Sequence, residues 1–472
     1  MRSNLAHSAS VQSVYRFLAP IVHRLPYPPG VLAESLAGRR EAAARWEAWA
    51  AGRGGDRPLI WSHAASVGEQ QVLEPVLARL LRTRRHLAIV QTHTSPSVLR
   101  TAVPAAVCHR DFLPLDEPRA VSRTLNALRP SLLIFGRGDL WPELVLGAFR
   151  RRIPIVVVGG AVRPGSLRLR ARRWLRDVHA TVSWLGAVSA PDADRWAQLG
   201  VPRSRIAVTG DPRHHRLIER VARLDAWRAV QAWAGDAPVL VAGSTEPSDD
   251  AVVAEAIARL RGTEPCPRTI LVPHNPAPGR VAAVRKRLTA VGCDAGLWSG
   301  PPAALPAATT VVVTAPGLLA DLYLAATVAY VGGGFRRGTL HAVAEPAAVG
   351  LPVIVGLRWE GSPDIGPMVA HGAAVPVGDA RSLARCVAAL IADADERGRV
   401  GLVARSVLTE GAAEASARAA LDLLAHAGDG RGDDGRSSVI TPAGAHRDQS
   451  PGTFRPTSMP APKTSGDTSP EV

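Results

Sequence analysis

The chain has 472 residues, of which 46% are apolar, so it is long enough for two hydrophobic cores and two domains are the default expectation. Its formal net charge is +15, and all but two of its 56 basic residues are arginine, which indicates an anionic partner: a phosphorylated substrate, a phospholipid surface or nucleic acid. Nucleic-acid binding is disfavoured, because aromatic residues make up only 4% of the chain and neither an aromatic sheet motif nor finger-like Cys/His spacing appears.

The four cysteines are scattered without metal-ligand spacing, which predicts buried free thiols in a reducing compartment. No signal peptide is apparent, and no apolar run approaches the roughly 20 residues that a membrane-spanning helix needs. Residues 11–25 predict a first helix with one apolar face and arginines elsewhere. Either this helix packs on the following domain, or residues 1–30 form an amphipathic segment that lies in a membrane interface.

Residues 31–210 alternate apolar runs with helical patterns, which predicts a parallel sheet with right-handed crossovers. The predicted strands lie in 58–64, 86–92, 105–115, 131–136, 153–160, 186–190 and 205–210. A second alternating series in 237–427 follows a linker over 211–236. Its predicted strands are 237–245, 268–274, 309–315, 327–334 and 351–356. Residues 428–472 lack apolar periodicity and predict a disordered tail.

The first strand is followed by a tight Ser-Val-Gly connection and then by Glu69, which begins a helical pattern. A carboxylate in the first turn of a helix complements the helix dipole, and this is one interpretation. The other is a general base on a strand-to-helix turn, which is where open α/β sheets place their chemistry. The local sequence leaves both interpretations open.

The segment 328–356 reads as a buried strand, a run of glycines and a helix that begins near Thr339. The run is Gly332, Gly333 and Gly334. Glycines allow close approach of a ligand, and the N–H groups at a helix start bind phosphate. His341 and Glu345 are four residues apart and are expected on one face of this helix, with Glu345 accepting from ribose hydroxyls. Together these features predict a nucleotide site, against the simpler interpretation of a glycine turn.

This segment, together with several others, resembles a known protein family. The pattern GGGF..G.LH...EPA..GLPVI.G is similar to the donor-binding signature of Kdo transferases, which attach 3-deoxy-D-manno-octulosonic acid (Kdo) to lipid A precursors. Further similar blocks follow the family's order over roughly residues 35–400: GRR (38–40), SHAASVGE (62–69), DLWPEL (139–144), GDPRHHR (210–216), VAGSTEPSDD (241–250) and LVPHNP (271–276).

The resemblance implies the GT-B fold, in which two doubly wound Rossmann-like domains face each other across a cleft. It also implies an inverting transfer of Kdo from CMP-Kdo to a lipid A precursor, without a bound metal or other cofactor. Consistent with this, the sequence shows no clustered Asp-x-Asp and no His/Cys constellation, and the Asp249–Asp250 pair reads as a helix start. The implied location is the cytoplasmic face of the inner membrane, where the arginine-rich stretches 149–154 and 163–177 would meet anionic lipid.

The family's functional positions map onto this chain residue by residue. Glu69 takes the place of the general base, and Asp139 that of a second acid which orients Glu69 or the acceptor. The acceptor side is assigned Ser66, Gly68 and Arg163. The nucleotide-sugar side is assigned Arg213, Ser244, Thr245, His274, Gly332, Gly333, Gly334, His341 and Glu345.

Three positions depart from the family pattern: Arg137 replaces a common Glu, Ala342 replaces the usual Asn after the donor-side His, and Glu143 replaces an Asn after Trp-Pro. They leave the expected base untouched but put the acceptor and full activity in doubt. Two alternatives therefore stay open. One is another GT-B cell-envelope enzyme that uses a different nucleotide sugar. The other is a non-catalytic nucleotide-binding relative.

Overall fold

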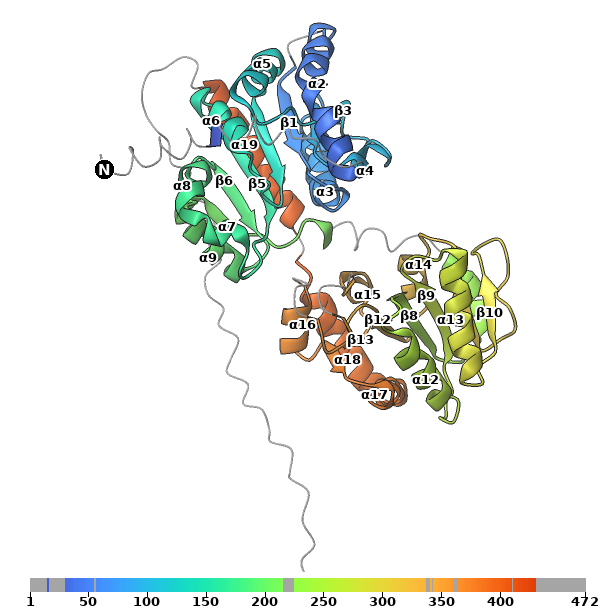
Figure 1. The fold of residues 1–472 in the computed structure, drawn as a ribbon. Helices are drawn as coiled ribbons and strands as arrows, with labels where there is room; N and C mark the ends of the chain where they lie inside the picture. Colours follow the sequence, from blue (N-terminus) through green and yellow to red (C-terminus); the bar gives the residue numbers. More distant parts are fainter. Residues whose placement is uncertain are drawn as a thin grey trace, which may run out of the picture. The chain divides into compact units, whose positions relative to one another are not determined.

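The structure is a computed structural model that describes residues 15–16, 30–54, 57–214, 225–336, 340–341, 343–359, 364–409 and 411–429. Within these residues the chain forms two parallel sheets, each with helices packed against it (Figure 1). The predicted helix over 11–25, apart from Tyr15 and Arg16, and the predicted tail beyond residue 429 lie outside the described residues.

The first sheet contains every strand that the sequence predicts for this half of the chain. In chain order they are β1 (Leu59–His63), β2 (Ala88–His93), β3 (His109–Phe112), β4 (Leu132–Gly136), β5 (Ile155–Gly160), β6 (Trp184–Ala187) and β7 (Ile206–Val208). Their order in the sheet is β3-β2-β1-β4-β5-β6-β7, and all pairs are parallel. Both faces of the central strands are buried, which explains their near-continuous apolar sequences.

The helices around the first sheet are α2 (Val31–Ala51), α3 (Val67–Thr83), α4 (Pro96–Leu99), α5 (Pro118–Leu128), α6 (Pro142–Arg150), α7 (Leu167–Arg170), α8 (Arg172–Ala180) and α9 (Ala190–Leu199). Several begin with proline in their first turn, because proline has a suitable φ angle and lacks only an N–H that would be unpaired there. Side chains alternate between two cores: Trp61 and Leu133 pack with α2 and α5, whereas Ile60 and Ile134 pack with α3.

The last described helix, α19 (Ala412–Asp429), packs against the first sheet although it follows the second in the sequence (Figure 1). Ala413, Ala417 and Ala420 are buried in the same core as Ile60 and Leu73. The small alanine side chains let this helix lie close to α3 and β4. The sequence range 237–427 includes most of this helix, which was expected to pack back across the domains, and its contacts are with α3 and the first sheet.

The second sheet has the same architecture. Its strands are β8 (Val239–Thr245), β9 (Arg268–Pro273), β10 (Ala295–Trp298), β11 (Thr310–Val313), β12 (Val328–Val331), β13 (Val353–Gly356) and β14 (Ala374–Val377), in the order β10-β11-β9-β8-β12-β13-β14. The sequence reading missed β10 and β14. Both are four-residue strands at the edges of the sheet, and β14 contains Pro376, which is tolerated at an edge because no ladder N–H is needed there.

The helices of this half are α11 (Asp225–Ala234), α12 (Asp250–Leu260), α13 (Pro278–Ala290), α14 (Leu319–Tyr323), α15 (Ala344–Ala348), α16 (Ile365–Ala370), α17 (Ala380–Ala392) and α18 (Ala394–Ser406). Leu240 and Ala242 pack with α12 and α17 on one face, and Val239 and Val241 pack with α11 and α14 on the other. The start of α17 is closed by a capping box between Asp379 and Ser382.

Two residues of the predicted N-terminal helix contact the first domain. The Tyr15 hydroxyl donates to Asp116 Oδ2 at 2.7 Å, and Arg16 Nε donates to Glu143 Oε1 at 2.6 Å. Asp116 is buried and also accepts from the N–H groups of Glu143 and Leu144 at the start of α6. Glu143, which departs from the family pattern, therefore has a partner inside this chain.

Candidate active site

Each sheet has one point at which the order of its strands reverses. In the first sheet β1 lies beside β4, and in the second β8 lies beside β12. Open α/β sheets bind ligands outside the carboxyl ends of the strands at such a point. Glu69 and Asp139 follow β1 and β4, while Ser244 and Gly332 lie at the ends of β8 and β12. The topology thus places most of the predicted residues at these two positions.

Glu69 lies in the first turn of α3. The Ser66 hydroxyl is the N-cap and accepts from the Glu69 N–H at 3.4 Å, and the Glu69 carboxylate accepts in return from the Ala65 N–H at 2.7 Å. Gly136 at the end of β4 packs closely against this turn, since an added Cβ would lie 3.1 Å from the Glu69 carbonyl oxygen. The carboxylate is therefore held on a rigid turn, as both interpretations of the sequence require.

The pKa of Glu69 is raised above its usual value. Burial is the main cause, and the negative charge of Asp139 raises the pKa further, against the Ala65 N–H, His63 and Arg168, which lower it. A carboxylate with a raised pKa accepts a proton more readily once it is ionised. A raised pKa suits a general base, whereas a helix dipole acting alone lowers the pKa of a carboxylate in the first turn.

Asp139 lies in a different environment. The Trp141 Nε1–H donates to Asp139 Oδ2 at 3.0 Å, His63 Nε2 lies 3.6 Å from the same oxygen, and Arg168 Nη2 lies 3.6 Å from Oδ1. Burial by itself raises the pKa of Asp139, but His63, Arg168 and the Trp141 N–H outweigh it, so the pKa falls below its usual value. Asp139 thus remains an anion beside a more basic Glu69.

Trp141 connects this pair to the early Gly-Arg-Arg block. The Arg39 guanidinium lies over the Trp141 ring at 4.2 Å, a cation–π contact worth about 2 kcal/mol when it is shielded from water. Arg39 is buried and donates to the carbonyl oxygens of Leu113 and Pro114 after β3. Trp141 is therefore both packed at the start of α6 and bonded to an acid of the site.

The predicted acceptor residues are only partly brought together. Ser66 and Gly68 belong to the same turn as Glu69, but Arg163 is exposed in the turn before α7. The arginine that lies beside Asp139 is Arg168, which the sequence does not distinguish from the other arginines of 163–177. His63 was also missed, because a histidine in a buried strand gives no signal of which carboxylate it faces.

Arg213, predicted for the nucleotide sugar, lies in an ion-pair cluster. Asp211 is buried, and its Oδ2 lies 2.5 Å from Arg137 Nη2 and 2.7 Å from Arg213 Nη2. Burial by itself raises the pKa of Asp211, but the two guanidinium groups hold it well below its usual range. Arg137, which also departs from the family pattern, thus has a defined partner.

A cavity of about 210 Å³ at the carboxyl ends of β8 and β9 is lined by Ser244, His274 and Glu345, three of the predicted nucleotide-side residues. Two larger hollows, of about 700 and 710 Å³, lie beside α13 and at the amino ends of β1 and β4. The smaller cavity is the better candidate, because parallel sheets bind ligands at the carboxyl ends of their strands. Ser244 has a left-handed φ of 51°, and Thr245 after it is buried.

The glycine run after β12 packs against the end of β8. A Cβ at Gly332 would lie 2.4 Å from the Ser244 carbonyl oxygen, and one at Gly334 would lie 2.5 Å from the Gly356 nitrogen. Gly333 has a φ of 90° and donates its N–H to Asp249 Oδ2 at 2.8 Å. The glycines thus allow the ends of neighbouring strands to lie close together. This packing role is separate from the close approach of a ligand that the sequence predicts for them.

Asp249 joins these two strand ends. Its Oδ2 also accepts from the Glu246 N–H at 2.7 Å, and its Oδ1 accepts from the Tyr330 hydroxyl at 2.8 Å. The prediction of a helix start at Asp249–Asp250 is confirmed, because Asp249 is the N-cap residue of α12 and Asp250 is its first residue. The Asp249 side chain makes no capping bond, however, and contacts the strand ends instead. Asp250, its neighbour, pairs with Arg280 at 2.5 Å.

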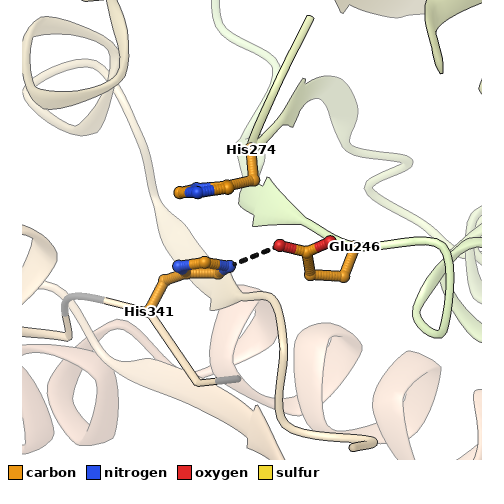
Figure 2. Close-up of side chains that lie close together, drawn as sticks. All are labelled: Glu246, His274 and His341. Carbon is orange, nitrogen blue, oxygen red and sulfur yellow. Dashed lines mark hydrogen bonds and ion pairs between the residues drawn. The ribbon is translucent and has the colours of Figure 1, made fainter. Parts of the chain in front are cut away.

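His341 lies before a helix and not on one. The expected helix start near Thr339 is wrong, because α15 begins at Ala344 and the His341 N–H bonds instead to the Gly332 carbonyl oxygen. Figure 2 shows His341 stacked on His274, with ring centroids 3.9 Å apart, and paired with Glu246 through a 2.9 Å contact. Glu345 lies in the first turn of α15.

The structure brings together two groups of potential metal ligands that the sequence did not suggest. They are Glu246, His274 and His341 in one group, and Asp211, His214 and Asp364 in the other. In the first group burial and His341 lower the pKa of His274, against Glu246, which raises it. The first group combines residues that are 28 to 95 positions apart, and in the second group Asp364 is 150 positions from His214, so spacing alone did not indicate either group.

Residues 38–216 match the protein family described as 3-deoxy-D-manno-octulosonic-acid transferase (kdotransferase). The chain is 30% identical over 394 residues to the 3-deoxy-D-manno-octulosonic acid transferase of Bordetella pertussis, covering 78% of this chain and 89% of the relative. It is 27% identical over 379 residues to the enzyme of the same name from Haemophilus influenzae, covering 77% and 86%.

Among solved structures, the UDP-GlcNAc 2-epimerase of Neisseria meningitidis bound to UDP-GlcNAc matches with a TM-score of 0.56 and 13% identity, over 77% of this chain and 99% of the epimerase. At this identity the likeness concerns the fold alone, and it confirms the predicted GT-B class. None of the helices in the described part of the chain combines the length and apolar character needed to cross a bilayer.

Proposed function

The chain belongs to the 3-deoxy-D-manno-octulosonic acid transferase family, and we propose that it moves Kdo from CMP-Kdo to a hydroxyl group of a lipid A precursor, with inversion at the anomeric carbon. The observation that carries this proposal is the Ser66–Glu69 turn at the reversal point of the first sheet. It holds a half-buried carboxylate with a raised pKa beside a second acid whose pKa is lowered.

In the proposed reaction Glu69 accepts the proton of the acceptor hydroxyl as its oxygen attacks the anomeric carbon of Kdo. The new carbon–oxygen bond forms while the bond from that carbon to the CMP phosphate oxygen breaks, and CMP leaves as an anion. The leaving group is a phosphate, so it needs stabilisation of negative charge and not a strong general acid. We assign this stabilisation to backbone N–H groups and to the imidazoles of His274 and His341.

Asp139 is the proposed positioning residue. Its charge raises the pKa of Glu69, and its own ionised state is maintained by His63, Arg168 and Trp141. In this arrangement an acceptor that brings its hydroxyl to Glu69 also meets the Arg168 guanidinium, which suits a phosphorylated sugar.

The direct test is to incubate the purified protein with freshly generated CMP-Kdo and a tetraacylated lipid A precursor, and to measure added Kdo by mass spectrometry. We expect one or more additions. Absence of product together with thermal protection by UDP-sugars, and not by CMP, would overturn the donor assignment. Absence of product with protection by CMP would favour a non-catalytic nucleotide-binding protein.

We further propose that the enzyme meets its lipid acceptor as a peripheral protein of an anionic membrane surface. Leu167, Trp174 and Phe149 are large apolar side chains that are 76%, 60% and 56% exposed on α7, α8 and α6. Arginines lie within a few positions of these residues in the sequence: Arg150, Arg151, Arg168, Arg170, Arg172, Arg173 and Arg176. Apolar side chains flanked by arginines are typical of a segment that lies in a lipid interface.

Flotation with vesicles that contain anionic lipid tests this surface. We expect the Leu167→Ala, Trp174→Ala double variant to bind less than the original protein, and binding to fall with added salt. Leu402→Ala is the matched control, because Leu402 is 72% exposed on α18 of the second sheet. Equal flotation of all three proteins would contradict the assignment of this surface.

A further inference from the structure

We propose that His63 is a positioning residue of the transfer reaction: its Nε2–H donates to Asp139 and thereby holds that carboxylate beside Glu69. The role rests on the proposed function, because Glu69 is the base of that reaction. His63 is the last residue of β1 and is buried, and its Nε2 lies 3.6 Å from Asp139 Oδ2. Among the residues that the structure describes, Nε2 makes no hydrogen bond, and a buried polar atom without a partner is costly. Asp139 is the acceptor that this nitrogen lacks.

The Thr92 hydroxyl determines which nitrogen of His63 carries the proton. Thr92 Oγ1 lies 2.9 Å from His63 Nδ1 and accepts the Trp61 Nε1–H, also at 2.9 Å. The hydroxyl has a single hydrogen, and its other acceptor, the Ser62 carbonyl oxygen, is 3.4 Å away. The shorter contact makes the stronger bond, so the hydroxyl donates to Nδ1. Because Nδ1 accepts, the proton of the neutral ring lies on Nε2, the nitrogen nearer to Asp139.

The sheet fixes the position of the imidazole ring. His63 is paired in register with Thr92 on β2 and with Phe135 on β4. The Phe135 ring packs against the imidazole at a centroid distance of 5.8 Å, with an angle of 64° between the planes. Contacts on both sides restrict rotation of the ring. Nε2 is therefore held at the place where the chain leaves β4 and reaches Asp139.

Asp139 is able to accept this second hydrogen bond. Its Oδ2 already accepts the Trp141 Nε1–H at 3.0 Å, and a carboxylate oxygen has two lone pairs. The present separation of 3.6 Å from His63 Nε2 exceeds a hydrogen-bond length. Hydrogen bonds of active sites are often long in the free enzyme and shorten in the complex with substrate. We therefore expect the His63–Asp139 bond to form fully when the acceptor is bound.

The consequence for catalysis is an anion at a fixed distance from the base. Asp139 has Trp141 and His63 at Oδ2, and Arg168 lies 3.6 Å from Oδ1. The negative charge of Asp139 raises the pKa of Glu69, and this effect depends on the distance between the two charges. A carboxylate held from both sides keeps that distance constant during the reaction.

Two substitutions separate the two nitrogens of His63. The amide nitrogen of glutamine is as many bonds from Cα as Nε2, whereas the amide group of asparagine takes the place of Nδ1. His63→Gln therefore keeps a donor for Asp139, and His63→Asn keeps only an acceptor for the Thr92 hydroxyl. We expect His63→Asn to lower kcat for Kdo transfer by up to about 100-fold with unchanged CMP affinity, and His63→Gln to retain most of the activity. Equal losses in the two variants would overturn the proposal.

The pH profile is a readout that a purely structural role would not move. His63 lowers the pKa of Glu69, against the burial and the Asp139 charge that raise it. Because Glu69 must be ionised to act, the acid limb of kcat/KM should lie at higher pH in His63→Asn than in the original protein. In His63→Gln it should stay near its original place. A shift to lower pH in His63→Asn would contradict the proposed donation.

His93→Asn is the matched control. His93 is a buried histidine at the end of the neighbouring strand β2, and neither of its ring nitrogens has a hydrogen-bond partner in the described part of the chain. Burial is the main cause that lowers the pKa of His93 to about 4, so its ring is uncharged at neutral pH. His93→Asn should leave both kcat and the acid limb unchanged, and thermal unfolding checks that all variants are folded.

The proton on His63 can also be observed without turnover. NMR spectra of the full-length protein labelled with ¹⁵N in histidine distinguish a protonated ring nitrogen from a bare one, and comparison with His63→Gln assigns the signals. We expect a protonated Nε2, whose signal moves in Asp139→Asn. A bare Nε2 would overturn the proposal. If the original protein transfers no Kdo, the proposed function fails, while this measurement still decides whether His63 donates to Asp139.

Discussion

The two reversal points of the molecule use the same topology in different ways. At the first, β1 and β4 carry ionisable side chains whose pKa values are driven apart by burial and by neighbouring charges. At the second, β8 and β12 approach each other through glycines, and Asp249 joins them by hydrogen bonds. The first edge therefore carries the proposed proton acceptor, and the second carries the proposed binding site for the nucleotide sugar.

This difference predicts how the two sites respond to substitution. A change of charge at the first site should alter the rate or its pH dependence while the fold persists, because Glu69 lies on a turn that is closed by its own cap. A larger side chain at the second site should lower the free energy of unfolding and weaken ligand binding. The ends of β8 and β12 lie so close together that no volume is left for it.

The largest expected effect is that of Glu69→Gln. Removing a general base costs about 10²–10⁴-fold in rate, so kcat for Kdo transfer should fall by that factor. Thermal unfolding and CMP affinity should stay close to those of the original protein, since glutamine can still accept from the Ala65 N–H. Glu74→Gln on the same helix is the matched control and should retain activity. A Glu69→Gln protein within tenfold of the original rate would contradict the assignment of the base.

An intermediate effect is expected for Gly332→Ala at the second site. The added Cβ would lie 2.6 Å from Thr245 Cα, so the two strand ends must separate. We expect the free energy of unfolding to fall by about 1–3 kcal/mol, measured by chemical denaturation, together with weaker binding of CMP. Gly279→Ala is the control: it lies in α13 with no atom within 4 Å of the added Cβ, and should be neutral or slightly stabilising. Equal stability of both variants would show that the approach of β8 and β12 tolerates a side chain.

The smallest and most diagnostic effect is on the pH profile. Glu69 must be ionised to act, so kcat/KM should rise with pH through the raised pKa of Glu69. The negative charge of Asp139 contributes to that rise in pKa, so Asp139→Asn should move the acid limb of the profile to lower pH. Arg168 lowers the same pKa, so Arg168→Gln should move the limb to higher pH. Shifts in the same direction would refute the electrostatic account of this site.

Much of the fold could be predicted because apolar runs and helical patterns are local features. Every strand of the first sheet and the inner strands of the second were found in this way. The edge strands β10 and β14 were missed because four residues with one buried face, or a proline, leave little apolar signal. The helix expected near residue 339 begins instead at Ala344, and the His341 N–H donates to the Gly332 carbonyl at the end of β12, a tertiary contact that the local sequence does not indicate.

The residues of the candidate site also fall into two classes: those that the local sequence indicates, and those that only tertiary contacts bring together. Glu69 and its cap could be read from adjacent residues, and Ser244, His274 and Glu345 do line one cavity. By contrast, Asp249 and Glu246 matter through contacts with residues about 80 to 95 positions away, which only the strand order brings together. Arg213 was placed with the nucleotide sugar by resemblance, whereas its described ion pairs are with Asp211 and Asp364.

The position of α19 has a consequence for how the protein is made. Ala413, Ala417 and Leu424 complete a core whose other members, such as Ile60 and Leu77, are synthesised near the start of the chain. The face of β4 and β5 that α19 contacts is therefore covered only in part, by α3, until residues 412–429 have been synthesised, and exposed apolar strands are prone to wrong associations. The domain that leaves the ribosome first is the one that is completed last.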